Sequence, residues 1–490
     1  MSRRALGGIA GAAGLIAVLT LLARAAGFGR TLVFADSVRA SGVGDVYNIV
    51  NAVPNVVHEV AAGGALAAVT VPLIAGHLGR GQRAQAHATA STLLSWALVI
   101  LVPLAALVWV LAEPISDLLV PSRIPDGVST GATMLRVFAV QIPLYGLAIV
   151  VSGLLHAHSR FAAVAMAPLV SSVLVMATYG AYGSIAQGAT TAVPPHAIQV
   201  LAWGTTAGVA GLALPLLVPA WRSGWRYRPT LRFVGEDAQR ARRLAGAGLI
   251  ALAAQQIATL TSLRIAATYG GGEGAASVYT WILAVVMLPY AVLVIPLATA
   301  AFPALATRAA ADPDAEAAQL EAGRAHAEGL LGRALHVAVL LGALGALGLV
   351  LLSPIVGAVF SSLDARRGGG TVSGAAVPAM AAGLRAFAPG LIGFGVQALL
   401  TRALYVRGRP VTAGLAVALG WLVAVAVPAV ALTAGSGAGD TVVLLGVGWS
   451  LGMTLAAALL LALAVRHWGS GILRGWGGTV RYLRTRLGAA

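Results

Sequence analysis

The chain has 490 residues, of which 59% are hydrophobic and only 10% are charged. An ordinary soluble domain carries roughly 25% charged residues, and single soluble cores stop growing near about 250–300 residues. The composition therefore excludes a soluble globular enzyme and indicates a protein that crosses a membrane many times. The net charge of +16 does not indicate a nucleic-acid partner, because no basic soluble face with base-reading residues accompanies it.

Long stretches of the chain contain no charged residue, and each is long enough for at least one membrane-spanning helix of about 20 residues. They cover residues 84–112, 161–221, 274–307, 334–363, 411–439 and 441–465. None shows the alternating polarity that a membrane β-barrel requires. We therefore predict an all-α membrane protein.

Twelve helices are predicted in chain order, the first over residues 6–38. Its charged start and small residues also resemble a secretory signal peptide. We expect an uncleaved helix, because Arg24 and Arg30 lie in the apparent cleavage region and suit a membrane-embedded site. The other ranges are 44–77, 86–119, 129–157, 162–184, 194–220, 240–268, 274–307, 331–361, 376–405, 411–433 and 441–465.

The arginines predict the topology. Arginine supplies all 32 basic residues of the chain, and most of them fall in cytoplasmic segments when the N-terminus is placed inside. This is the distribution that the positive-inside rule describes. An even number of helices then leaves both termini in the cytoplasm.

A basic segment, 222–243, divides the sequence near its middle and is interpreted as a cytoplasmic linker. It separates an N-terminal six-helix lobe, 1–221, from a C-terminal six-helix lobe, 244–466. The tail, 467–490, mixes arginines with aromatic and aliphatic residues. Such a segment is predicted to lie on the anionic inner leaflet of the membrane.

The two halves share a weak internal repeat. Tyr47 and Pro72 in the first half recur as Tyr279 and Pro303 in the second half at nearly equal offsets. This favours a duplicated bundle with its site where the halves meet, which is the usual plan of a transporter. The alternative is that Tyr and Pro are simply common near helix ends.

Charged residues inside the apolar stretches mark a candidate site, since a charge at mid-membrane costs about 2.5–3.5 kcal/mol on insertion scales. Arg24 and Arg30 lie in the first helix, and a guanidinium group binds phosphate oxygens with paired hydrogen bonds. Arg264 lies in the most polar helix of the second half. Snorkelling or a structural ion pair is the alternative for these arginines.

The second helix carries a polar stripe at three- and four-residue steps. Its members are Asn48, Asn51, Asn55, His58 and Glu59. Three functional interpretations of Glu59 stay open: it pairs with an arginine of the first helix, it pairs with His58, or it takes up a proton during transport. A buried pair that only fixes helix packing is the structural alternative.

No cofactor, metal site or catalytic residue is predicted. The chain has no Cys, and its nine His show no ligand spacing. It also lacks a Walker loop and a nucleophile with a base and an acid in reach. We therefore expect neither an enzyme nor ATP hydrolysis by this chain.

Several motifs point in one direction. ARAAGFGRTLVFA starts at residue 23, and GDVYNIVNAVPNVVHEVAAGGALAAVTVPL follows from residue 44. HSRFAAVAMAP, IPLATAAFPALA and LLTRALYVRGRP come later in the same order. Together they resemble the MurJ/MviN lipid II flippases of the multidrug/oligosaccharidyl-lipid/polysaccharide exporter superfamily.

The resemblance implies two six-helix lobes that form a V-shaped central cavity, open alternately to either side of the bacterial cytoplasmic membrane. It also implies that Arg24, Arg30 and Asp45 line the site for the pyrophosphate and sugar portion of a lipid-linked peptidoglycan precursor. Ala284 and Met287 depart from the family pattern, which commonly has Arg and Glu there. Well-known members also carry two more C-terminal helices than the twelve predicted here.

The leading hypothesis is a flippase that moves lipid II by alternating access, with the precursor and membrane lipids as its partners. One alternative is an exporter of another lipid-linked oligosaccharide or of small compounds; an exporter of cations should expose acidic residues in its cavity. The other alternative is a non-transporting scaffold for cell-wall synthesis proteins. A scaffold would tolerate Arg24→Ala but fail when 467–490 is deleted.

Overall fold

A computed structural model describes residues 3–40, 42–61, 66–190, 192–233, 249–270, 272–294 and 317–474. Every regular element in these ranges is a helix. Ten of the described helices are long and apolar enough to cross a membrane, and one bent pair of helices brings the number to eleven. The predicted all-α membrane fold is confirmed.

The chain divides into two compact units. Unit 1 consists of Met1–Leu252, Gly270–Ser277 and Val359–Val377. Unit 2 consists of Ala253–Tyr269, Val278–Ala358 and Pro378–Ala490. Two short segments from the second half of the sequence therefore pack within the unit that the first half builds.

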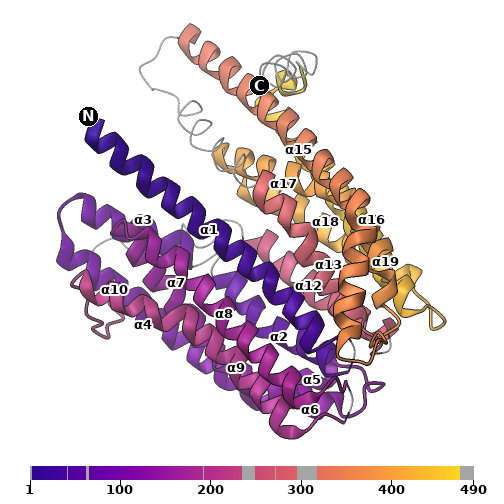
Figure 1. The fold of residues 1–490 in the computed structure, drawn as a ribbon. Coiled ribbons are helices and arrows are strands. Elements are labelled where there is room, and N and C mark those ends of the chain that lie inside the picture. The colour runs from indigo at the N-terminus through magenta and orange to yellow at the C-terminus, as the bar shows by residue number, and fades with distance from the viewer. Residues whose placement is uncertain are drawn as a thin grey trace. The chain divides into compact units, whose positions relative to one another are not determined.

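Unit 1 is built from helices that pack through small residues. Helix α1 runs alongside α8, and α8 packs against α9 (Figure 1). Gly204, Gly208 and Gly211 of α9 face α8 so closely that an added side chain would collide with it. The elements are α1 (Arg3–Ser37), α2 (Val43–Val60), α3 (Leu66–Gly79), α4 (Arg83–Val110), α5 (Ala112–Leu119), α6 (Gly127–Ala139), α7 (Gln141–Ala157), α8 (Phe161–Ala186), α9 (Pro195–Ala213), η2 (Leu214–Leu216) and α10 (Leu217–Arg222).

Most of α12, α13 and α15 belongs to unit 2, where α18 packs along α19. That contact is also close, because Gly420, Gly448 and Gly452 each approach the backbone of the other helix. Helices α16 and α17 form the bent pair, with an angle of 50° between them. The elements are α12 (Leu249–Gly270), α13 (Ala275–Pro289), η3 (Tyr290–Val294), α15 (Ala317–Arg366), η4 (Val377–Ala379), α16 (Met380–Phe387), α17 (Gly390–Val406), α18 (Pro410–Ala431), α19 (Ala438–Trp468) and η5 (Ser470–Leu473).

Several predicted helices are covered by two elements in the structure. The ranges 44–77, 86–119 and 129–157 contain α2 with α3, α4 with α5, and α6 with α7. Helix α15 starts earlier than predicted, at Ala317 instead of 331. The repeat residue Pro303, the linker after residue 233 and the tail after residue 474 lie outside the described residues.

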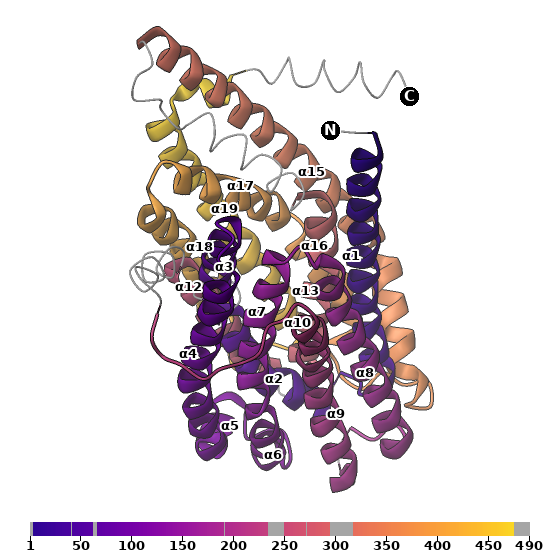
Figure 2. The ribbon, with the colours of Figure 1, turned by 90° about the vertical axis from the view of Figure 1, so that its left-hand side faces the viewer.

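The first part of the predicted linker lies along α4 in an extended conformation (Figure 2). Ser91 accepts a hydrogen bond from the Trp225 indole nitrogen at 3.3 Å. Ser95 accepts one from the backbone N–H of Thr230 at 3.1 Å, and its hydroxyl lies 3.0 Å from that of Tyr227. Polar side chains of α4 thus hold residues 225–232 against this helix within unit 1.

Candidate functional site

The two candidate arginines of α1 are exposed side chains on an otherwise apolar helix. Among the described residues, neither Arg24 nor Arg30 forms an ion pair. Arg30 lies within electrostatic range of the hydroxyl groups of Tyr47, Tyr145 and Tyr179. These tyrosines belong to α2, α7 and α8, so Arg30 lies near polar residues that three other helices of unit 1 contribute.

The polar stripe of α2 turns toward α7, where Tyr145 is its main contact. The Tyr145 hydroxyl donates a hydrogen bond to Oδ1 of Asn55 at 3.1 Å. The His58 ring packs against the Tyr145 ring with 4.3 Å between the centroids. Glu59 is exposed and lies within electrostatic range of the same hydroxyl. The structure thus brings Arg30, Asn55, His58 and Glu59 around one tyrosine.

Two atoms of this stripe are buried without a hydrogen-bond partner among the described residues. They are Oδ1 of Asn51 and Nδ1 of His58. Leaving a buried polar atom unsatisfied costs free energy comparable to a lost hydrogen bond. A ligand group or a water molecule that bonded to these atoms would recover that free energy, so this part of α2 is suited to binding.

Asp45 has a different environment at the start of α2. Its carboxylate is only 1% exposed and accepts hydrogen bonds from the backbone N–H groups of Gly274 and Ser277, each at 2.9 Å. The Ser277 hydroxyl donates a third hydrogen bond at 2.7 Å. These donors lie at the N-terminus of α13, where a carboxylate satisfies otherwise free N–H groups and opposes the helix dipole.

Asn48 joins the same contact. Its side-chain nitrogen donates hydrogen bonds to the backbone oxygen of Gly44 at 3.0 Å and to the Ser277 hydroxyl at 3.1 Å. The predicted stripe therefore has two parts. Asp45 and Asn48 bind other parts of the chain, whereas the part from Asn51 to Glu59 keeps unsatisfied or exposed groups.

Arg264 belongs to unit 2. It lies in α12 with a half-buried side chain, and its Nη1 atom is buried without a hydrogen-bond partner among the described residues. This is the environment expected of a charged group that binds a ligand or water. A shared role with the arginines of α1 stays a prediction.

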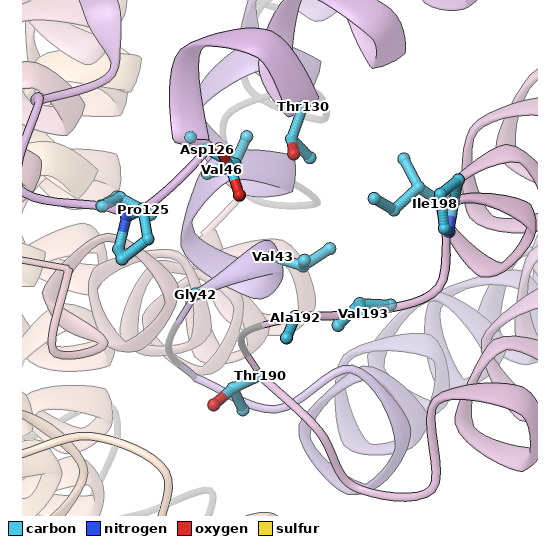
Figure 3. A pocket seen from close by; sticks show the side chains of 13 residues that line it. Gly42, Val43, Val46, Pro125, Asp126, Thr130, Thr190, Ala192, Val193 and Ile198 are labelled. Atoms are coloured by element: carbon cyan, nitrogen blue, oxygen red, sulfur yellow. The ribbon is translucent and has the colours of Figure 1, made fainter.

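A cavity of about 210 Å³ lies beside the start of α2, between the α5–α6 and α8–α9 loops (Figure 3). Most of its lining residues are apolar, with Val43, Val46 and Ile198 among them, and Asp126 and Thr130 are among those that add polar groups. None of the predicted site residues lines it. In addition, the described residues contain no group of three His, Asp or Glu side chains arranged to hold a metal ion.

Sequence reasoning missed Tyr145 and Ser277. Tyr145 lies in an apolar helix and carries no pattern that marks it as polar, and its role depends on the position of α7 beside α2. Ser277 is 232 positions from Asp45, its hydrogen-bond acceptor, in the chain. A signal for Ser277 did exist, because it is a hydroxyl residue at the start of a predicted apolar helix.

Comparison with known proteins gives a consistent picture. The family model described as lipid II flippase MurJ matches residues 34–488. The lipid II flippase MurJ of Burkholderia cenocepacia is 26% identical over 408 residues, which cover 79% of this chain and 71% of that protein. Arg24 and Arg30 precede the range that the family model matches.

Solved structures resemble the fold. A lipid II flippase MurJ in an inward closed conformation matches with a TM-score of 0.69 and 15% identity, over 94% of this chain and 90% of that one. An inward-facing multidrug resistance MATE family transporter of the MOP superfamily matches with a TM-score of 0.67 and 16% identity, over 90% of this chain and 95% of that one.

Proposed function

Because the chain belongs to the MurJ family of lipid II flippases, we propose that it moves lipid II from the inner to the outer leaflet of the cytoplasmic membrane by alternating access. The chain is a multi-pass membrane protein, and its family is one of transporters. In this proposal both termini lie in the cytoplasm, as the arginine distribution indicates. The end of α1 at Ser37 then lies on the outer side.

One observation carries the proposal: Arg24 and Arg30 of α1 are exposed and form no ion pair among the described residues, and Arg30 lies within electrostatic range of a partly unsatisfied polar face. Guanidinium groups bind a pyrophosphate through paired, charge-assisted hydrogen bonds. Amide, imidazole and phenol groups suit the hydroxyl and amide groups of a sugar. We assign Arg24 and Arg30 to the pyrophosphate, and Asn51, Asn55, His58 and Tyr145 to the adjoining polar head group.

Transport requires a difference in affinity between the two access states, since a ligand shifts a conformational equilibrium only by its differential binding. In this proposal, Arg24 and Arg30 supply affinity for the pyrophosphate in the state that is open to the inner side. The apolar lipid tail stays in the bilayer and needs no polar site. Glu59 lies close enough to this site to weaken anion binding when it is ionised, so its protonation state would modulate head-group affinity.

A depletion experiment tests the function. The resident lipid II flippase of a bacterium is depleted, the wild-type chain, Arg24→Ala or Arg30→Ala is expressed, and lipid II in the outer leaflet is labelled. We expect growth and labelling with the wild type and a loss of at least about tenfold with either variant, which corresponds to one charge-assisted interaction of about 1.4 kcal/mol or more.

Arg160→Ala is the matched control, because Arg160 is an exposed arginine in the α7–α8 loop and lies outside the polar face. We expect it to label like the wild type at equal membrane abundance. Wild-type labelling by both α1 variants would contradict the assignment of the arginines. No rescue by an abundant wild-type chain would instead favour another lipid-linked substrate or a scaffold.

A further inference from the structure

Arg39 follows the end of α1 and has an unusual environment for an arginine. Its backbone has a positive φ of 72°, and the residue is only 5% exposed. The guanidinium group donates hydrogen bonds of 2.7 Å each to the backbone oxygens of Asp364, Gly188 and Thr371. The Arg39 side chain therefore connects the end of α1 to two other parts of the chain, the loop at Gly188 and the segment from Asp364 to Thr371, and all of them belong to unit 1.

Asp364 completes the arrangement from the other side. It is fully buried, and its carboxylate accepts hydrogen bonds from the backbone N–H of Ala40 at 2.7 Å and of Ser373 at 2.6 Å. The Ser373 hydroxyl adds a hydrogen bond of 2.8 Å, and Nη2 of Arg39 lies 4.0 Å from Oδ2. Arg39 thus holds the backbone around Asp364, and Asp364 holds the backbone beside Arg39.

A second, more exposed layer surrounds this core. The carboxylate of Asp36 forms ion pairs with Arg366 at 2.6 Å and with Arg367 at 3.1 Å. The Arg366 side chain is 67% exposed, so water screens its pair. The buried pair and the exposed pairs connect the same two segments: the end of α1, and the last turn of α15 with the residues that follow it.

The chemistry of this contact indicates that it can open. Arg39 and Asp364 bind through hydrogen bonds and charge, and water can replace such bonds at modest net cost once the segments separate. Removing only one partner leaves a buried charge unsatisfied, which is strongly unfavourable. A contact of this kind favours two states, fully formed or fully hydrated, over partial opening.

The surrounding backbone is shaped for close contact. An added side chain at Gly368 would collide with the Arg39 guanidinium group, and one at Gly188 would collide with the backbone of Arg367. Gly188, Gly369 and Gly370 all have positive φ angles. Glycines that permit close approach also let the segment change its conformation easily.

We propose that Arg39 and Asp364 form a reversible latch, which holds the segment 364–377 against the end of α1 and must release in each transport cycle. In the proposed topology the latch lies at the outer end of unit 1, so its release belongs to the step that delivers lipid to the outer leaflet. The latch itself is a property of unit 1 and holds for any substrate; only its link to transport rests on the proposed function.

The first test measures opening without any substrate. The natural chain has no Cys, so a single Ala376→Cys, at a fully buried position in the segment, reports exposure through its rate of reaction with a maleimide in proteoliposomes. We expect Arg39→Gln to raise this rate at least tenfold. Arg366→Gln, which removes only an exposed arginine of the same contact, should change it less than twofold.

A parallel reporter separates release from unfolding. Val175→Cys lies buried in α8, away from the latch segment, and we expect it to stay unreactive when Arg39→Gln is present. Two results would overturn the latch: an unchanged rate at Ala376→Cys in Arg39→Gln, or equal increases at both reporters, which would mean that Arg39 only maintains the fold.

The second test closes the latch covalently. Ala40→Cys and Ser373→Cys place one cysteine on each side of the latch, where the Ala40 nitrogen lies 2.9 Å from the Ser373 hydroxyl oxygen, and oxidation is used to link them. The control pair, Val175→Cys with Gly208→Cys, joins α8 to α9, where Cβ atoms would lie 3.6 Å apart, a distance suited to a disulfide.

We expect oxidation of the latch pair to reduce lipid II transport at least tenfold and reduction to restore it, while the control pair transports in both states. Full transport by the oxidised latch pair would overturn the requirement for release. If the reduced pairs and the wild type all fail to move lipid II, the proposed substrate is wrong, and the maleimide rates still decide whether the latch exists.

Discussion

The acidic residues at the two ends of α2 differ in burial and in hydrogen bonding. Asp45 in its first turn is buried and accepts three hydrogen bonds from the start of α13. Glu59 near its last turn is exposed and forms no ion pair with any described residue. Between them, Asn48 has two hydrogen bonds, whereas Oδ1 of Asn51 has none within the described parts of the chain.

This difference separates structural charge from functional charge. A buried polar group that has all its partners within the chain stabilises the fold, and its removal leaves those partners unsatisfied. A group without partners lowers stability while the site is empty and raises affinity when a ligand arrives. Stability and transport should therefore respond in opposite ways to substitutions at the two ends of α2.

The largest expected effect on stability is at Asp45. Asp45→Ala removes the acceptor of three hydrogen bonds, and a single hydrogen bond to a charged group contributes about 1.5–3 kcal/mol net to stability. Because such contributions are not additive, we expect a loss of about 3 kcal/mol, measured by thermal unfolding in detergent. Asp45→Asn keeps one acceptor oxygen, so its stability should lie between that of the wild type and that of Asp45→Ala. An unchanged unfolding midpoint in Asp45→Ala would contradict the structural role.

Tyr145→Phe should have a smaller effect. It removes the hydrogen bond to Asn55 and keeps the ring that packs on His58, so we expect a loss of about 1 kcal/mol. Tyr182→Phe is the matched control, because the buried Tyr182 hydroxyl has no hydrogen-bond partner in the described residues. Equal destabilisation by both variants would show that the Asn55 contact contributes nothing specific.

Asn51→Leu should change transport and stability in opposite directions. It replaces a half-buried amide, whose Oδ1 atom is buried without a hydrogen-bond partner among the described residues, by an apolar side chain. We therefore expect stability to stay equal or rise by up to about 1 kcal/mol while lipid II transport falls. Asn48→Leu is the control, since it breaks two existing hydrogen bonds and should lower stability. A loss of stability in both variants would remove the distinction between the two parts of the stripe.

The sequence predicted the fold because the physical signal is local. An uncharged stretch such as 441–465 must span the membrane as a helix to satisfy its backbone, and α19 covers it. The internal divisions were less well predicted: the bend between α16 and α17 lies at Pro389, directly before α17, whereas one continuous helix was predicted over 376–405. The three-residue and four-residue spacing of the α2 stripe likewise predicted which residues share a face.

The partners of the predicted residues could not be found from the sequence. Asp45 and Ser277 are 232 positions apart, and Arg39 binds the backbone of Asp364 across 325 positions. Local spacing says nothing about such pairs. The family resemblance marked Asp45 as a site residue, and only the positions of Gly274 and Ser277 at the start of α13 show that its oxygens are already occupied.

The smallest effect is expected where charge is both paired and exposed. Nη2 of Arg136 in α6 lies 3.7 Å from Glu113 in α5, with side chains 40% and 73% exposed. Water screens such a pair, so Arg136→Ala should cost no more than about 0.5 kcal/mol and leave lipid II transport unchanged. The unfolding stability and the lipid II transport of Arg136→Ala are measured in parallel with those of Asp45→Ala and Arg24→Ala, under the same conditions. A loss of transport in Arg136→Ala would show that arginines on unit 1 act through their summed field, and the separation between structural and functional charge would then fail.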